Sequence, residues 1–148
     1  MAWMPGRSGQ QQRQPPLLVL VVAGDAQARS GLMALARPFG VDVREAQDGE
    51  AAYRLALARP PDLILCDLEK PAPDGFGFIP RLRRDPRFAQ ILAVAVSETA
   101  RRFDVAVARE GGFDGHIAKP VTPEGLARLL DRALDRQSAR DESESQRA

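Results

Sequence analysis

The chain of 148 residues has only one cysteine, one histidine, one tryptophan and one tyrosine, and its formal net charge is only +1. A single cysteine excludes an internal disulfide framework and fits a reducing compartment. The net charge is near zero and both signs are interspersed, so the sequence shows no basic patch of the kind that binds nucleic acid. No apolar stretch approaches the length of a membrane span. We therefore expect a cytoplasmic globular protein that binds neither nucleic acid nor membrane.

The two ends of the sequence differ in composition from the middle. Residues 1–16 are rich in Gln, Pro, Arg and Gly and are predicted to form a disordered arm. Residues 138–148 are polar and are predicted to form a disordered tail. The apolar run 17–23 follows two arginines and imitates part of a signal peptide. It is short, however, two prolines abut it, and it fits a buried strand equally well. We interpret it as a strand and predict one folded domain over 17–137.

Between these ends, short apolar runs alternate with helix-like stretches. The runs are typical of strands covered on both faces, with one alternating edge strand: Leu17–Val22, Val41–Glu45, Leu63–Cys66, Ile91–Val96 and His116–Ala118. The stretches between and after them have helical spacing or helix-end signals: Ala26–Arg37, Gly49–Ala58, Phe76–Arg84, Thr99–Glu110 and Thr122–Arg136. Five such units predict an α/β fold, a doubly wound five-stranded parallel sheet of the flavodoxin-like (βα)5 kind with strand order 2-1-3-4-5.

Three polar side chains follow apolar runs: Asp67, Ser97 and Lys119. In such a sheet the carboxyl ends of the first, third, fourth and fifth strands line one crevice, so we expect these residues and Ala23–Asp25 to gather there. A carboxylate, a hydroxyl and an ammonium suit phosphoryl transfer, in which the carboxylate is the nucleophile and the other two meet the phosphoryl oxygens. The residue types alone fit equally well an Asp–Lys ion pair that caps strand ends, with Ser97 as the start of a helix.

With these motifs in this order, the sequence resembles the receiver domain of bacterial two-component response regulators from about Leu17 to Arg136. The matching segments are the phosphoacceptor loop Asp67–Gly75, with Pro71, Asp74 and Gly75 in register, the switch residue Ser97, the pair Lys119-Pro120 and the turn Asp48-Gly49. The resemblance implies that Asp67 accepts phosphate from a histidine kinase or phosphotransfer protein. It also implies that Lys119 binds the phosphoryl group and that Ser97 swings to hydrogen-bond it.

The resemblance further implies a signalling protein and not an enzyme. The tail after Arg136 is too short for a DNA-binding or catalytic domain, so we expect a stand-alone receiver. Its output would pass to a downstream protein partner through the face of the fourth helix, fifth strand and fifth helix, as in relatives.

One part of the family pattern is missing. The family places two acidic residues, which hold Mg²⁺, directly after the first strand, and here Ala23-Gly24 stand there with Asp25 one place late. Of the metal ligands that the resemblance implies, Asp67 and the backbone carbonyl of Glu69 remain. Mg²⁺ needs several oxygen ligands in octahedral geometry. The sequence leaves open whether Asp25 or the Glu69 side chain supplies a replacement, so Mg²⁺ is a possible cofactor.

A second departure is His116, where the family usually has Tyr or Phe as the rotating switch residue. An imidazole could swing in a similar way with added pH sensitivity, or it could face solvent with no role. Cys66 is expected to be a small core residue.

Three functions remain open. One is a receiver that switches by phosphorylation at Asp67, and another is a phosphorylation-independent pseudo-receiver that serves as an interaction module. The third is a small hydrolase or nucleotide-binding enzyme on the same fold. The enzyme is disfavoured because the chain lacks a Gly-rich phosphate loop and the two-Asp pattern of a phosphatase.

Overall fold

The structure, a computed structural model, describes residues 16–68, 78–98 and 111–147. Its elements are β1 (Leu18–Val22), α1 (Ala26–Ala36), η2 (Arg37–Phe39), β2 (Asp42–Ala46), α2 (Gly49–Ala58), β3 (Leu63–Asp67), α3 (Phe78–Arg83), η3 (Pro86–Phe88), β4 (Leu92–Ser97), β5 (Gly115–Ala118) and α5 (Pro123–Arg147). All strand pairs are parallel, and the sheet order is β2-β1-β3-β4-β5. The predicted fold class is confirmed.

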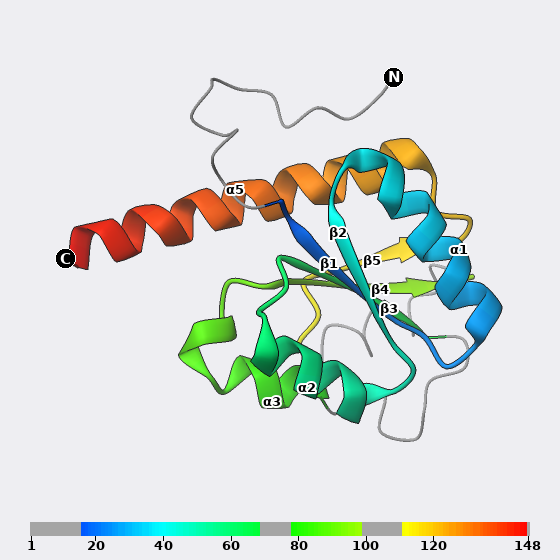
Figure 1. The fold of residues 1–148 in the computed structure, drawn as a ribbon, viewed down its shortest axis with the longest axis horizontal. Coiled ribbons are helices and arrows are strands. Elements are labelled where there is room, and N and C mark those ends of the chain that lie inside the picture. The colour runs from blue at the N-terminus through cyan, green and yellow to red at the C-terminus, as the bar shows by residue number, and fades with distance from the viewer. Residues whose placement is uncertain (1–15, 69–77, 99–110, 148) are drawn as a thin grey trace.

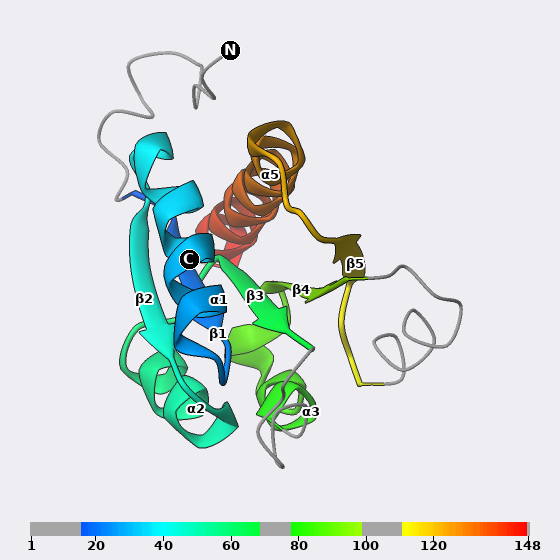
Figure 2. The ribbon, with the colours of Figure 1, turned by 90° about the vertical axis from the view of Figure 1, so that its right-hand side faces the viewer.

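Alternation along the central strands gives the sheet two apolar faces. Val19 and Val21 pack in one cluster with α1 and α5, whereas Leu20 and Val22 pack in the other with α2 and α3. Figures 1 and 2 show these two helix pairs on opposite sides of the sheet. Cys66 lies in the second cluster and is 2% exposed, so its predicted place in the core is confirmed.

Most predicted boundaries agree with the structure to within one or two residues. The strands β3 and β4 end one residue later than predicted, so Asp67 and Ser97 are their last residues. The predicted start of α3 at Phe76 lies outside the described residues, and the described part of this helix runs from Phe78 to Arg83 and contains Pro80. The predicted helix Thr99–Glu110 lies outside the described residues, as does nearly all of the predicted N-terminal arm.

The last helix is longer than predicted. Thr122 caps it as expected, since its Oγ1 accepts a hydrogen bond from the backbone N–H of Gly125 at 3.0 Å. The disordered tail predicted over 138–148 is wrong, because α5 continues to Arg147. No proline or glycine interrupts the sequence after Gly125, and Gln137 and Arg140 both contact a carboxylate at the amino end of the sheet.

That carboxylate is Asp62, which precedes β3 and is buried. Its Oδ2 accepts the backbone N–H of Leu18 at 2.8 Å, and Arg140 Nη2 donates to its Oδ1 at 3.2 Å. Burial raises the pKa of Asp62 and outweighs the opposing effects of the Leu18 hydrogen bond and the Arg140 charge. Asp62 therefore joins the start of β1 to the distal half of α5.

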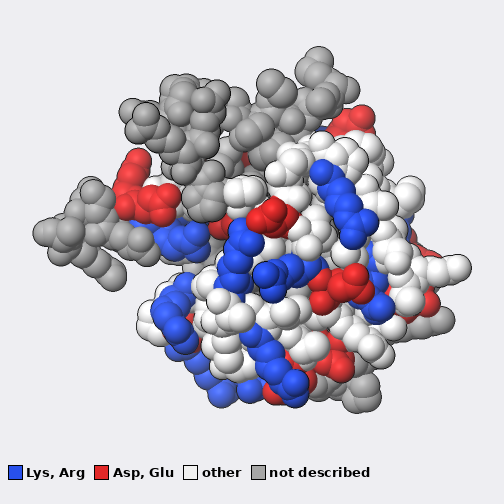
Figure 3. All heavy atoms as spheres, viewed as in Figure 1, with Lys and Arg blue, Asp and Glu red and all other residues white. Residues whose placement is uncertain are grey.

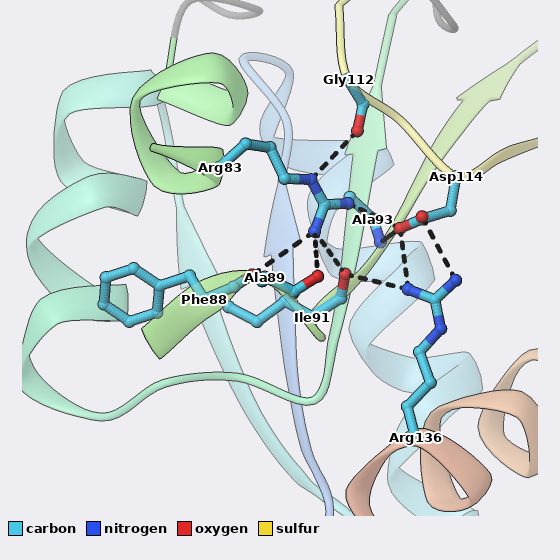
Figure 4. A network of polar contacts seen from close by, with 8 residues as sticks. All are labelled: Arg83, Phe88, Ala89, Ile91, Ala93, Gly112, Asp114 and Arg136. Atoms are coloured by element: carbon cyan, nitrogen blue, oxygen red, sulfur yellow. Dashed lines mark hydrogen bonds and ion pairs between the residues drawn. The ribbon is translucent and has the colours of Figure 1, made fainter. Parts of the chain in front are cut away.

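Asp114, which precedes β5, makes an equivalent set of contacts (Figure 4). Its Oδ2 accepts the backbone N–H of Ala93 at 2.8 Å and lies 2.6 Å from Arg83 Nη2 and 3.2 Å from Arg136 Nη1. Burial alone would raise the pKa of Asp114, but the Ala93 hydrogen bond and the two guanidinium groups outweigh it and hold the pKa below its usual value. We call these two sets, Asp62–Arg140 and Asp114–Arg136, the Asp–Arg clamps.

Basic and acidic side chains are interspersed on the surface shown in Figure 3. Ion pairs join many of them, for example Arg59 with Asp42 at 2.9 Å and Arg81 with Glu50 at 3.1 Å. Within the described ranges, no helix combines the length and the apolar character that crossing a membrane requires.

Candidate functional site

Asp67 and Lys119 meet at the carboxyl edge of the sheet. Asp67 ends β3 and is 4% exposed, and Lys119 directly follows β5. Lys119 Nζ lies 2.7 Å from Asp67 Oδ2, and its backbone N–H donates to the carbonyl of Ser97 at 2.7 Å. The sheet therefore holds a carboxylate and an ammonium in direct contact, as the topology predicted.

Ser97 lies one strand away from Asp67, at the end of β4, and is also buried. Its Oγ is 2.6 Å from Nε2 of His116, which is partly buried on β5. His116 is therefore not a solvent-facing residue without a partner, because its ring contacts the hydroxyl that the sequence identified as the switch group.

An arginine side chain contacts the carboxyl end of β1. Strand register pairs Val22 with Cys66, which places Ala23 beside Asp67 at the next position. The Ala23 carbonyl accepts a hydrogen bond from Arg29 Nη1 at 2.8 Å, and Arg29 Nε donates to Glu45 at 2.9 Å. A guanidinium thus joins β1 to β2 beside the position where the family pattern places its acids.

The described side chains at this edge do not form a Mg²⁺ site. Asp25 Oδ2 accepts the backbone N–H of Ala28 at 3.0 Å as the N-cap of α1, Asp48 caps α2 in the same way, and Glu45 pairs with Arg29. Among the described residues, no group of three or more His, Cys, Asp or Glu side chains could hold a metal ion. The predicted replacement ligand Asp25 is thus engaged elsewhere, and Glu69 lies outside the described residues, as do Pro71, Asp74 and Gly75 of the predicted loop.

An open hollow of about 540 Å³ lies beside the Asp67–Lys119 pair. Its lining is mainly apolar and comes from α1, the residue after β4 and the segment after β5: Ala28, Gly31, Leu32, Leu35, Glu98, Lys119, Pro120 and Val121. Gly31 is exposed in the middle of α1, and, apart from its chain neighbours and the backbone of α1, no heavy atom lies within 4 Å of the place a Cβ would occupy there. The hollow therefore has Lys119 in its wall and an open position on α1.

Sequence reasoning placed Asp67, Ser97 and Lys119 correctly but missed two contacts. The hydrogen bond between Ser97 and His116 follows from the register of β4 and β5. The two residues lie two positions apart on the same face of these neighbouring strands. The role of Arg29 had no sequence signal, since an arginine in the first turn of a helix is ordinary.

Comparison with known proteins identifies the chain's relatives. A family model described as the response regulator receiver domain matches residues 19–131. The chain is 37% identical over 117 residues to the gliding motility regulatory protein of Myxococcus xanthus and 33% identical over 123 residues to the nitrate/nitrite response regulator protein NarL of Escherichia coli. These matches cover 78% and 81% of this chain but only 15% and 56% of those proteins. An uncharacterized 14.6 kDa protein of Leptolyngbya boryana is 33% identical over 112 residues, 76% of this chain and 86% of that protein.

Solved structures agree. A response regulator protein from Burkholderia multivorans superimposes with a TM-score of 0.66 at 30% identity, covering 78% of this chain and 93% of that one. The chemotaxis protein CheY4 of Vibrio cholerae gives a TM-score of 0.71 at 24% identity, covering 80% of this chain and 98% of that one, and it supports the fold alone. Relatives of this kind are signalling modules of two-component systems and not enzymes. With most of its length matched by the family model and by these relatives, the chain belongs to the response regulator receiver domain family.

Proposed function

We propose that this receiver domain is a cytoplasmic signalling module whose phosphoryl acceptor is Asp67. The observation that supports this most directly is the contact between Lys119 Nζ and Asp67 Oδ2 at 2.7 Å, on a carboxylate held at a strand tip. The ammonium that neutralises the carboxylate in the resting protein is positioned to meet phosphoryl oxygens once they are attached to it.

The bonds that change in the transfer belong to Asp67 and to a phosphohistidine donor. An oxygen of Asp67 attacks phosphorus and forms the O–P bond of an acyl phosphate while the N–P bond of the donor breaks. The electron pair of that bond stays on the donor imidazole, which takes up a proton. Lys119 stays beside the new dianionic group and stabilises it.

Two kinds of protein partner follow from this proposal. The first is the histidine kinase or phosphotransfer protein that supplies the phosphoryl group, and the apolar hollow beside Lys119 is a surface that such a donor could cover. The second is a downstream partner that reads the switched state. The predicted output face includes the helix Thr99–Glu110 and so lies partly outside the described residues. The absence of nucleic acid and membrane partners stays a prediction.

The tip of β1 favours a second candidate function, a phosphorylation-independent pseudo-receiver that acts as an interaction module. Ala23 and Gly24 offer no carboxylate, and Asp25 caps α1. A metal ion normally neutralises charge that develops during phosphoryl transfer, so transfer without one should be severely slowed. In this case Asp67 and Lys119 form a permanent ion pair that joins β3 to the segment after β5.

Labelling separates the two functions. Native protein, Asp67→Asn and the double variant Ala23→Asp, Gly24→Asp are incubated with acetyl phosphate and Mg²⁺. An acid-stable, hydroxylamine-labile phosphate on the native protein but not on Asp67→Asn supports the phosphoacceptor. No label on the native protein, with label on the double variant, establishes the pseudo-receiver. Equal labelling of the native protein and the double variant would rule the pseudo-receiver out.

A further inference from the structure

The contact between Ser97 and His116 joins two neighbouring strands on one face of the sheet. Register pairs Ala95 with His116 and Ser97 with Ala118, so the two residues are diagonal neighbours offset by two positions. An offset of two positions keeps both side chains on the same face of the sheet. Ser97 Oγ and His116 Nε2 are 2.6 Å apart.

Two arrangements of protons fit this contact. Nε2 can carry a proton and donate it to the Ser97 oxygen, or the Ser97 hydroxyl can donate to Nε2 of a neutral imidazole whose proton is on Nδ1. Only the second arrangement engages the hydroxyl proton of Ser97.

We propose that His116 is a positioning residue that holds the hydroxyl proton of Ser97 in the resting protein. A serine hydroxyl has one proton to donate, and phosphoryl oxygens only accept hydrogen bonds. While Ser97 donates to His116, the same proton is unavailable to a group on Asp67. His116 and the phosphoryl group therefore compete for it.

The consequence for switching rests on the proposed function, since it requires a phosphoryl group on Asp67. Ser97 can serve that group in two ways. It can rotate away from His116, or the imidazole can take up a proton on Nε2 and become the donor, which leaves the hydroxyl proton for the phosphoryl oxygen. Either route changes the state of Nε2. A Tyr or Phe ring, which the family usually has here, offers no ring nitrogen to accept this proton.

The test uses the only histidine of the chain, which gives a single set of imidazole signals. Long-range 15N–1H correlation spectra of the full chain are recorded at about pH 8, above the ordinary titration range of imidazole. We expect Nε2 to have the shift of an unprotonated ring nitrogen and Nδ1 that of a protonated one. Ser97→Ala should shift Nε2 toward the values of a solvent-exposed histidine, and Ser97→Thr, which keeps the hydroxyl, should restore it. Ser138→Ala is the control and should change nothing.

Two results would overturn the proposal. One is a proton on Nε2 in the native protein at this pH, and the other is an Nε2 shift that Ser97→Ala leaves unchanged. Neither readout needs phosphate, so a failure to label Asp67 would refute the proposed function without affecting this result. If Asp67 does take label, the Nε2 signal must move on phosphorylation, and an unmoved signal would refute the competition.

Discussion

Removing the carboxylate of Asp114 should destabilise the domain more than its position outside the strands implies. Asp114→Ala removes the acceptor of the Ala93 backbone N–H, and Ala93 is 1% exposed. A buried donor left without an acceptor costs about 1–3 kcal/mol. The ion pairs with Arg83 and Arg136 are partly exposed and add roughly 0.5–1 kcal/mol. We expect a total loss of about 2–4 kcal/mol, which corresponds to a fall in melting temperature of roughly 6–12 °C.

Asp114→Asn separates the hydrogen bond from the charge. Its amide oxygen can still accept from the Ala93 N–H, so the loss should be about 1 kcal/mol at neutral pH. The folded protein holds the pKa of Asp114 below its unfolded value of 3.8. The charge therefore stabilises the fold fully above that value, and its contribution disappears as the pH falls through the lower folded pKa. The gap between native protein and Asp114→Asn should close once the pH falls below the folded pKa of Asp114.

Urea unfolding followed by circular dichroism measures both effects. Asp85→Asn is the matched control, because Asp85 also pairs with an arginine, Arg87 at 2.7 Å, but the backbone N–H that it accepts is that of the exposed Arg87 and not that of a buried strand residue. Its unfolding midpoint should not change measurably. If Asp114→Ala unfolds at the same urea concentration as Asp85→Asn, or if the gap for Asp114→Asn does not close in acid, the reasoning is wrong.

Four further predictions concern the core, α1 and α5. Burial, with a smaller effect of the Asp67 charge, raises the pKa of Cys66 to about 12, so at pH 8 its thiolate fraction is roughly a thousandfold lower than for a thiol of pKa 9.0, and iodoacetamide should label it only after unfolding. Gly31→Ala should raise stability to urea by about 0.5–1 kcal/mol, because helix propensity improves without a clash. Gly31→Glu should slow phosphotransfer from a kinase while labelling by acetyl phosphate matches that of Gly31→Ala. Arg140→Ala should destabilise the fold by about 1–3 kcal/mol in urea, because it leaves the buried Asp62 carboxylate without its guanidinium, and an unchanged midpoint would contradict this.

The sheet could be predicted from the sequence because its strands are short apolar runs between clear helix signals. Leu63 to Cys66 can only be a buried strand in this context, and the polar residue that follows it must emerge at the carboxyl edge. The same argument applies to Ser97 and Lys119. Parallel topology then brings the three together without any need for side-chain detail.

Side-chain partners were harder to predict. Asp25 stands near the position of a metal ligand, yet a carboxylate three residues before an unpaired helix N–H is equally suited to capping, and the cap is what forms. The polar sequence after Arg136 has the composition of a tail. Its helix depends on tertiary contacts with Asp62, which lies 78 residues from Arg140 in sequence. Local composition contains no information about a partner that distant.

The two Asp–Arg clamps also define how α5 can move. Arg136 and Arg140 are one helical turn apart and fasten the helix at the amino edge of the sheet, whereas Lys119 and the first turn of α5 lie at the opposite edge. The clamps lie at the middle of α5 and just beyond it, and at 1.5 Å per residue Arg136 is about 20 Å along the helix from its first residue. A displacement that begins at Lys119 would then be largest at the first turn of α5 and smallest at the clamps. A partner that reads the state of Asp67 through α5 would therefore gain most by contacting its first turns.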